Sequence, residues 1–166
     1  MRRLLPLADE SGAAAAEMAL IVPLVIVLLF GGLEAGHFVW SQHKVVEAVR
    51  DGARFAGRLP ITEVCPEGGT MSEASKDEVR LLTRTGQIAN PDAISKVPGW
   101  TNAQIEVTPN CGAFVDTGIY SQLGGAGPIV TVQASGPYPS LLNGLGIAAF
   151  ASIDLSAESN APVIGI

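Results

Sequence analysis

The N-terminal third of the chain is an apolar run that leads directly into an amphipathic one. Apolar residues fill positions 13–33, interrupted only by Glu17 and Pro23. A helix of this length crosses about 30 Å of hydrocarbon, so we predict a transmembrane helix over residues 13–36. A proline inside such a helix is tolerated. The alternative is a cleaved secretory signal peptide, but the apolar stretch of a signal peptide has only about 7–15 residues.

Two features of the apolar run are unusual for a bare membrane anchor. A carboxylate near the bilayer core costs about 2.5–3.5 kcal/mol on insertion scales, so Glu17 is expected to have a function. Gly32 and Gly36 form a small-xxx-small pair, a pattern that lets a second membrane helix approach closely. We therefore treat Glu17, Gly32 and Gly36 as candidate contact residues.

Residues 37–57 continue the helical pattern without a proline and become amphipathic. Small apolar residues recur at helical spacing on one stripe, and charged residues on the opposite stripe are typical of a solvated face. The apolar stripe consists of Val45, Val49, Gly52, Ala53 and Ala56, and the charged stripe of Lys44, Glu47, Asp51, Arg54 and Arg58. The two runs together predict one helix over residues 14–57, of which only the first half lies in lipid.

Strand patterns dominate the C-terminal half of the chain. Apolar and polar residues alternate in 103–108, 128–134 and 147–158. Each segment has one apolar face, as expected for an antiparallel sheet that is covered on one side. The apolar faces comprise Ile105 and Val107, then Val130, Val132 and Ala134, and finally Ala149, Ala151, Ile153, Leu155 and Ala157. The apolar stripe of residues 45–56 is the expected cover.

Residues typical of turns and helix caps mark the boundaries between the remaining elements. Pro60 and the loop at 65–70 end the long helix, and a short helix over 76–85 follows a capping box that begins at Ser75. A crossover framed by proline and glycine, with a helical turn starting at Ser140, joins the last two strands. The predicted fold class is α+β: a long N-terminal helix, half transmembrane and half amphipathic, packed on a small antiparallel β-sheet. Residues 37–166 form its single extramembrane domain.

Composition and charge narrow the possible partners. Hydrophobic residues make up 48% of the chain, charged residues only 16%, and the net charge is −6. No basic face is available to neutralise phosphates, so no nucleic-acid partner is expected. Positive charge does not settle the orientation in the membrane, because two arginines precede the span while Lys44 and Arg50 follow it.

The two cysteines bear on the compartment. Cys65 and Cys111 both follow the predicted span and both lie in predicted loops. A pair of this kind suggests one disulfide in an oxidising compartment, which would place residues 37–166 outside the cytoplasm. The alternative is two unpaired thiols, since spacing alone does not prove pairing.

No pattern of residues indicates catalysis. The sequence has no nucleophile elbow, zinc-protease motif, phosphate-binding loop or dinucleotide fingerprint. His37 and His43 lie six residues apart on different sides of the predicted helix, so they do not form a metal-ligand pair. We therefore predict no catalytic, cofactor-binding or metal-binding residues, and a protein that is not an enzyme.

Two segments within residues 11–57 are distinctive: GAAAAEMALIVPLVIVLLFGGLEAG, followed by VVEAVRDGARFAG. In these segments the chain resembles the TadE-like family of the tight-adherence, or Flp-type, pilus system. The resemblance implies a pilin-like fold and a role as a minor pilin or pseudopilin in pilus assembly or priming. It also implies a single-pass protein of the bacterial inner membrane with a periplasmic C-terminal domain. Incorporation into an extracellular pilus is compatible with this location. The implied partners are a prepilin peptidase, other major and minor pilins, inner-membrane platform proteins and the lipid bilayer.

The resemblance also implies a function for Glu17. In pilin-like proteins a peptidase cuts after a glycine and leaves a glutamate as the fifth residue, which here predicts a leader over 1–12 cut between Gly12 and Ala13. The Glu17 carboxylate would then pair with the α-amino group of a neighbouring subunit's Ala13 and fix the axial register. Alternatively Glu17 only snorkels to the headgroups. A second hypothesis is an unprocessed single-pass protein whose periplasmic domain binds a partner of a secretion or pilus machine.

Overall fold

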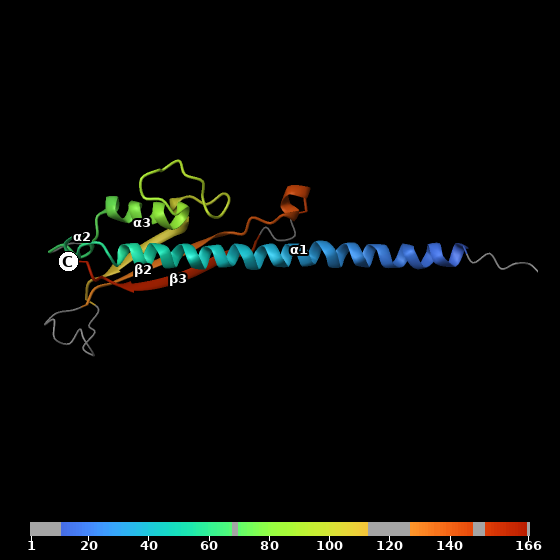
Figure 1. The fold of residues 1–166 in the computed structure, drawn as a ribbon, viewed down its shortest axis with the longest axis horizontal. Helices are drawn as coiled ribbons and strands as arrows, with labels where there is room; N and C mark the ends of the chain where they lie inside the picture. The colour runs from blue at the N-terminus through green and yellow to red at the C-terminus, as the bar shows by residue number, and fades with distance from the viewer. Residues whose placement is uncertain (1–10, 68–69, 113–126, 148–151, 166) are drawn as a thin grey trace, which may run out of the picture.

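One continuous helix organises the molecule. The computed structural model describes residues 11–67, 70–112, 127–147 and 152–165. Helix α1 runs over Ser11–Ala56 (46 residues) with Pro23 inside it, which confirms the long helix predicted over 14–57. Figure 1 shows that its C-terminal half lies along the sheet, whereas its N-terminal half projects away from the rest of the chain.

A three-stranded antiparallel sheet forms the second layer. The strands are β1 (Ile105–Asn110), β2 (Ile129–Pro137) and β3 (Asp154–Pro162), in the order β1-β2-β3. Their register aligns Ile105 with Ala134 and Val107 with Val132, and Ala134 with Ala157 on the other side. The apolar alternation predicted from the sequence therefore falls on one face, which confirms the α+β fold class.

All three strands begin and end later than predicted, at 105–110, 129–137 and 154–162 instead of 103–108, 128–134 and 147–158. The first strand begins at Ile105 and not at residue 103, because residues 102–104 form the 3-10 helix η1 (Asn102–Gln104), capped by the Thr101 hydroxyl. The last strand begins at Asp154 and not at residue 147. The alternation of small residues that suggested an earlier start includes Ala149 and Ala151, which lie outside the described residues.

The core lies between α1 and the inner face of the sheet, as predicted. The apolar stripe of α1 is fully or almost fully buried, with Val45, Val49 and Ala56 at 0% exposure. These side chains belong to the same apolar cluster as Val130, Val132 and Leu155 of the sheet. Their spacing along α1 places them on the same face of the helix in successive turns. On the opposite side of α1, Glu47 is exposed, as expected for the charged stripe.

Two further helices close one end and one edge of the domain. Helix α2 (Ile61–Val64) follows Pro60, and helix α3 (Glu73–Thr85) packs against α1 and β1 (Figure 1). The predicted capping box at Ser75 was wrong: the N-cap is Ser72, whose hydroxyl accepts from the backbone N–H of Ser75. Gly86 ends α3 in the left-handed conformation (φ 79°), as its position after the helical pattern predicts.

Candidate functional site: the free half of α1 and its junction with the domain

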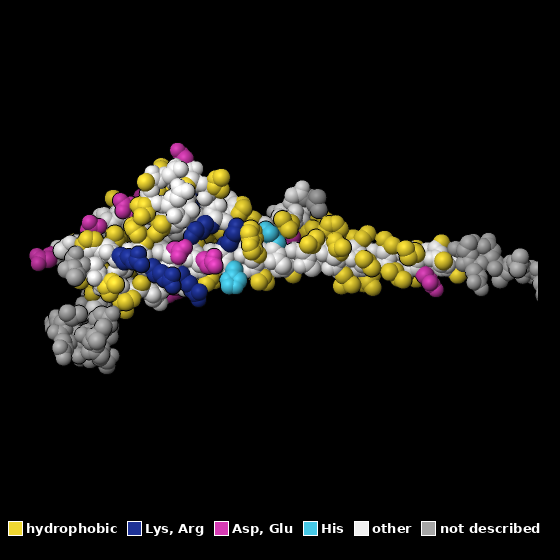
Figure 2. Space-filling model, viewed as in Figure 1, with side chains coloured by type: hydrophobic (Ala, Val, Ile, Leu, Met, Phe, Trp, Pro, Cys, Tyr) yellow, Lys and Arg dark blue, Asp and Glu magenta, His cyan; other side chains and the backbone are white. Residues whose placement is uncertain are grey.

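The N-terminal half of α1 carries a long apolar surface. Its large apolar side chains from Met18 to Leu33 are between 43% and 79% exposed. Figure 2 shows hydrophobic side chains along this part of the helix, while most charged side chains lie on the domain. Soluble monomers rarely expose contiguous apolar patches of more than a few hundred Å². Within the described residues α1 is also the one helix long and apolar enough to cross a membrane.

Gly12, Ala13 and Glu17 lie at the start of this helix. Gly12 and Ala13 are in its first turn, and Glu17 follows Ala13 by four residues, about 6 Å along the axis. Glu17 is exposed, and no salt bridge among the described residues involves it. The carboxylate therefore points out of the chain from an otherwise apolar surface. Residues 1–10 of the predicted leader lie outside the described residues.

The glycines of the free half are not required by packing against the described residues of the domain. A Cβ added at Gly12, Gly31, Gly32 or Gly36 would meet nothing within 4 Å. Glycine in a helix interior is less favourable than alanine by about 0.5–1 kcal/mol, so these positions carry a cost that the monomer does not need. Gly32 and Gly36 are exposed one turn apart, which keeps the predicted helix-packing face open to a neighbour.

The junction between the free half of α1 and the domain is built around Tyr138. Its hydroxyl donates to the backbone carbonyl of Glu34 at 3.2 Å and lies 2.9 Å from His37 Nδ1. Its ring meets that of Phe38 edge-on, with centroids 5.2 Å apart. Because the phenol has one hydrogen and gives it to Glu34, His37 Nδ1 must donate to the phenol oxygen. Burial, with a smaller effect of the Glu34 carboxylate, raises the pKa of Tyr138 to about 12, so this donor is retained at neutral pH.

Glu34 is the buried acidic residue of this junction. It is only 3% exposed, and neither carboxylate oxygen makes a well-formed hydrogen bond with the described residues. The Ser140 hydroxyl and the backbone of Leu141 and Leu142 are among its polar neighbours. The segment after β2 thus folds back over a carboxylate of α1.

Glu34 lies in the GGLEAG end of the segment that resembles the TadE-like family, but the sequence predicted no function for Glu34, His37 or Tyr138. The contact joins positions about a hundred residues apart in the chain, and no local pattern encodes such a pairing. The one available signal was Tyr138 between two prolines, Pro137 and Pro139, where a rigid turn fixes the direction of an aromatic side chain.

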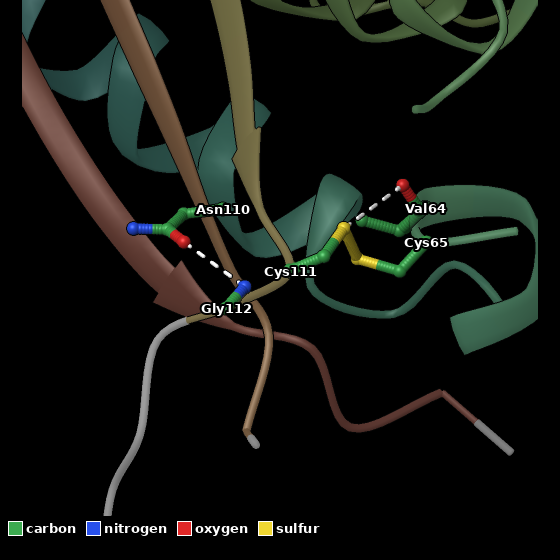
Figure 3. Close-up of a disulfide and its surroundings, with 5 residues drawn as sticks. All are labelled: Val64, Cys65, Asn110, Cys111 and Gly112. Carbon is green, nitrogen blue, oxygen red and sulfur yellow. Dashed lines mark hydrogen bonds between the residues drawn. A yellow bond between two sulfur atoms is a disulfide. The ribbon is translucent and has the colours of Figure 1, made fainter. Parts of the chain in front are cut away.

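A disulfide lies at the opposite end of the domain. Cys65, directly after α2, is bonded to Cys111, directly after β1, with their Cα atoms 5.7 Å apart (Figure 3). Asn110 stabilises the turn, because its side-chain oxygen accepts from the backbone N–H of Gly112 at 3.1 Å. The bond ties the segment after α1 to the sheet, in agreement with the pairing suggested by the sequence.

The histidines are separated, as the sequence predicts. His37 is bonded to Tyr138, whereas His43 is exposed on α1. In the part of the chain that the structure describes, no three His, Cys, Asp or Glu residues cluster as metal ligands would.

A free apolar helix half with a single carboxylate, joined to a small α+β domain, is the arrangement expected of a protein with a single helical membrane anchor. Residues 12–54 match the family model described as TadE-like protein, which confirms the predicted resemblance over most of α1. This is not a family of enzymes. The comparisons found no significant match among curated proteins or solved structures. The family match and the long apolar helix together fit a membrane-anchored, pilus-related protein.

Proposed function

We propose that the chain is a TadE-like minor pilin or pseudopilin that acts in the assembly or priming of a tight-adherence pilus. The observation that carries this proposal is the exposed apolar half of α1, which bears Glu17 and lies within the matched residues 12–54. Such a surface needs lipid before assembly and neighbouring helices after it. The same residues therefore serve as anchor and as assembly contact.

The proposed maturation step is a cut between Gly12 and Ala13 by a prepilin peptidase. Among the described residues, apart from the backbone of α1 itself, no atom lies within 4 Å of the place that a Cβ would take at Gly12. Glycine at this position gives a peptidase close access to the backbone. The new α-amino group of Ala13 then becomes the partner of a neighbouring subunit's Glu17, and the pairing fixes how far one helix is displaced against the next.

The proposed location is the inner membrane, with the α+β domain in the periplasm. The Cys65–Cys111 disulfide supports this orientation, because disulfides persist in oxidising compartments and are rare in the cytosol. Other pilins and the inner-membrane platform of the pilus are the proposed partners. The bilayer holds the subunit before it is incorporated.

The alternative is an unprocessed single-pass protein whose periplasmic domain binds a partner of a pilus or secretion machine. One observation favours it: α1 already begins at Ser11, so the Gly12–Ala13 bond lies inside the first helical turn. A peptidase would have to unwind that turn. The mass of the mature N-terminus decides between the two, since processing leaves a chain that starts at Ala13.

Two substitutions test the proposed function together. Gly12→Leu should block the cut, leave a full-length protein in the membrane and stop pilus assembly. Glu17→Ala should leave insertion and cleavage intact, because it makes the helix more apolar, but should impair incorporation into the pilus. Glu17→Gln is the matched control that keeps the size of the side chain and removes its charge, and it should fail in the same way as Glu17→Ala.

The readouts are the N-terminal mass of the mature protein and the amount of pilus on the cell surface. If Gly12→Leu and Glu17→Ala both leave these unchanged from wild type, the pilin proposal is wrong. The single-pass binding protein would then be preferred.

A further inference from the structure

The crossover that joins β2 to β3 is unusually apolar for a surface segment. Residues 117–153, which include it, contain no Lys, Arg, Asp, Glu or His. The structure describes residues 138–147 of the crossover, which contain one 3-10 helix, η3 (Leu142–Leu145). Leu141 and Ile147 on either side of η3 are 51% and 50% exposed. A segment that turns leucine and isoleucine outward and carries no charge is poorly suited to water.

The crossover lies near the outer end of the predicted span, residues 13–36. The apolar run from Ala13 to Leu33 measures about 30 Å at 1.5 Å per residue, which matches the thickness of the hydrocarbon, so residues 34–36 fall at its outer edge. The Tyr138 hydroxyl is bonded to the Glu34 carbonyl and to His37, which fixes the start of the crossover at this level. Figure 1 shows η3 beside the middle of α1, beyond the end of the sheet.

The arrangement around Glu34 agrees with a lipid boundary at this level. Its carboxylate is 3% exposed and faces the backbone of Leu141 and Leu142, so the crossover keeps the charge away from the surroundings. An apolar groove of about 290 Å³ runs beside it, lined by Gly31, Ala35, Phe38, Val39, Tyr138 and Ile153. Trp40, 53% exposed, lies two turns further along, where interfacial aromatic side chains gather in membrane proteins.

We propose that the crossover, residues 138–147, makes a second contact with the membrane. Its exposed Leu141 and Ile147 side chains insert at the outer surface of the bilayer that α1 spans. The inference rests on the proposed anchoring by α1 and goes beyond it. Lipid is the occupant because Tyr138 holds the start of the crossover against the Glu34 carbonyl, directly after the exposed Leu33 of the span, and because the crossover carries no charge with which to select a protein partner. The contact would hold the domain at a fixed tilt against the membrane until assembly removes it.

Single-cysteine labelling of the full-length protein tests the contact. The native cysteines are joined, so in unreduced protein an added cysteine is the reactive thiol, with wild type as the background control. Leu141→Cys and Ile147→Cys, each carrying an environment-sensitive fluorophore, are reconstituted in vesicles of phosphatidylethanolamine and phosphatidylglycerol. Ile94→Cys, at a position 92% exposed on the domain, is the matched water control, and Leu24→Cys, at a position 60% exposed in the span, is the lipid control.

The readout is quenching by lipid with a nitroxide near the headgroup, compared with quenching by aqueous iodide. Labels at 141 and 147 should lose fluorescence to the shallow nitroxide and be protected from iodide, whereas the label at 94 should behave in the opposite way. If labels at 141 and 147 behave like the label at 94, the inference is wrong although the anchoring stands. Protection from both quenchers indicates a protein neighbour and also overturns it. The label at 24, near the middle of the span, is tested with lipid that carries its nitroxide deep in the acyl chain; if it is not quenched there, the proposed anchoring fails, and the inference fails with it.

Discussion

The two halves of α1 use similar residue types for opposite purposes. Both are rich in alanine, valine and glycine, yet the N-terminal half exposes them and the C-terminal half buries them against the sheet. The space around each glycine shows this difference in burial. A Cβ at Gly32 would meet nothing, whereas one at Gly52 would collide with the Thr83 side chain and one at Gly57 would lie 2.7 Å from the Pro162 carbonyl.

This contrast separates two origins of constraint in one helix. In the C-terminal half each small residue is explained by a neighbour within the chain, because α3 and β3 approach the helix closely. In the N-terminal half no such neighbour exists among the described residues, so its small residues and its carboxylate are explained only by something outside the chain. Substitutions in the first half should therefore change assembly, and those in the second should change folding.

The largest effect on folding is expected at Val49. Val49 is fully buried between α1 and the sheet, so Val49→Asp places an unpaired carboxylate in the core. The free energy of unfolding should fall by about 3–4 kcal/mol. Urea unfolding of the full-length protein in detergent, followed by near-UV circular dichroism, measures it.

The control for Val49→Asp is Glu47→Ala on the exposed side of the same helix. It should stay within about 0.5 kcal/mol of wild type, as exposed substitutions usually do. Equal stability of the two variants would mean that the helix-on-sheet core is wrongly described.

The disulfide should stabilise the domain and leave the free half of α1 unaffected. Replacing Cys65 and Cys111 by serine should lower the free energy of unfolding by about 2–4 kcal/mol, because the unfolded domain loses a loop constraint. Helical circular dichroism from the free half of α1 should persist after the domain has unfolded. The bond itself is checked by thiol labelling of denatured, unreduced protein, and two reactive thiols per chain would contradict it.

The smallest effect expected here compares one glycine from the domain with one from the free half. A Cβ at Gly136 would lie 2.8 Å from Gln104 Cγ and 2.9 Å from Trp100 Cε2, so Gly136→Ala should destabilise the domain by about 1–3 kcal/mol. Gly32→Ala has open space and should not lower domain stability. If this glycine serves helix packing, Gly32→Ala should instead reduce cross-linking to neighbouring subunits in the membrane. An unfolding midpoint that falls equally in both variants would remove the distinction between the halves.

Much of the fold could be predicted from local patterns. The length of α1, its change from apolar to amphipathic, and the alternation in the strands depend on helical and strand periodicity, which neighbouring residues already express. The predicted boundaries of the elements were less accurate where a serine or threonine hydroxyl accepts a hydrogen bond from a nearby backbone N–H group. Ser72, and not Ser75, caps α3, and the Thr101 turn delays β1 by two residues.

The sequence by itself predicted a membrane-spanning helix in one stretch of the chain, because an apolar run of this length is typical of such helices. It also determined the apolar stripe of the amphipathic half. Only the tertiary structure decided that Tyr138 contacts Glu34 and that Cys65 reaches Cys111, since each contact joins a helix segment to the end of a strand. The physical reason is range: periodicity acts over a few residues, whereas the packing of α1 on the sheet decides which distant side chains meet.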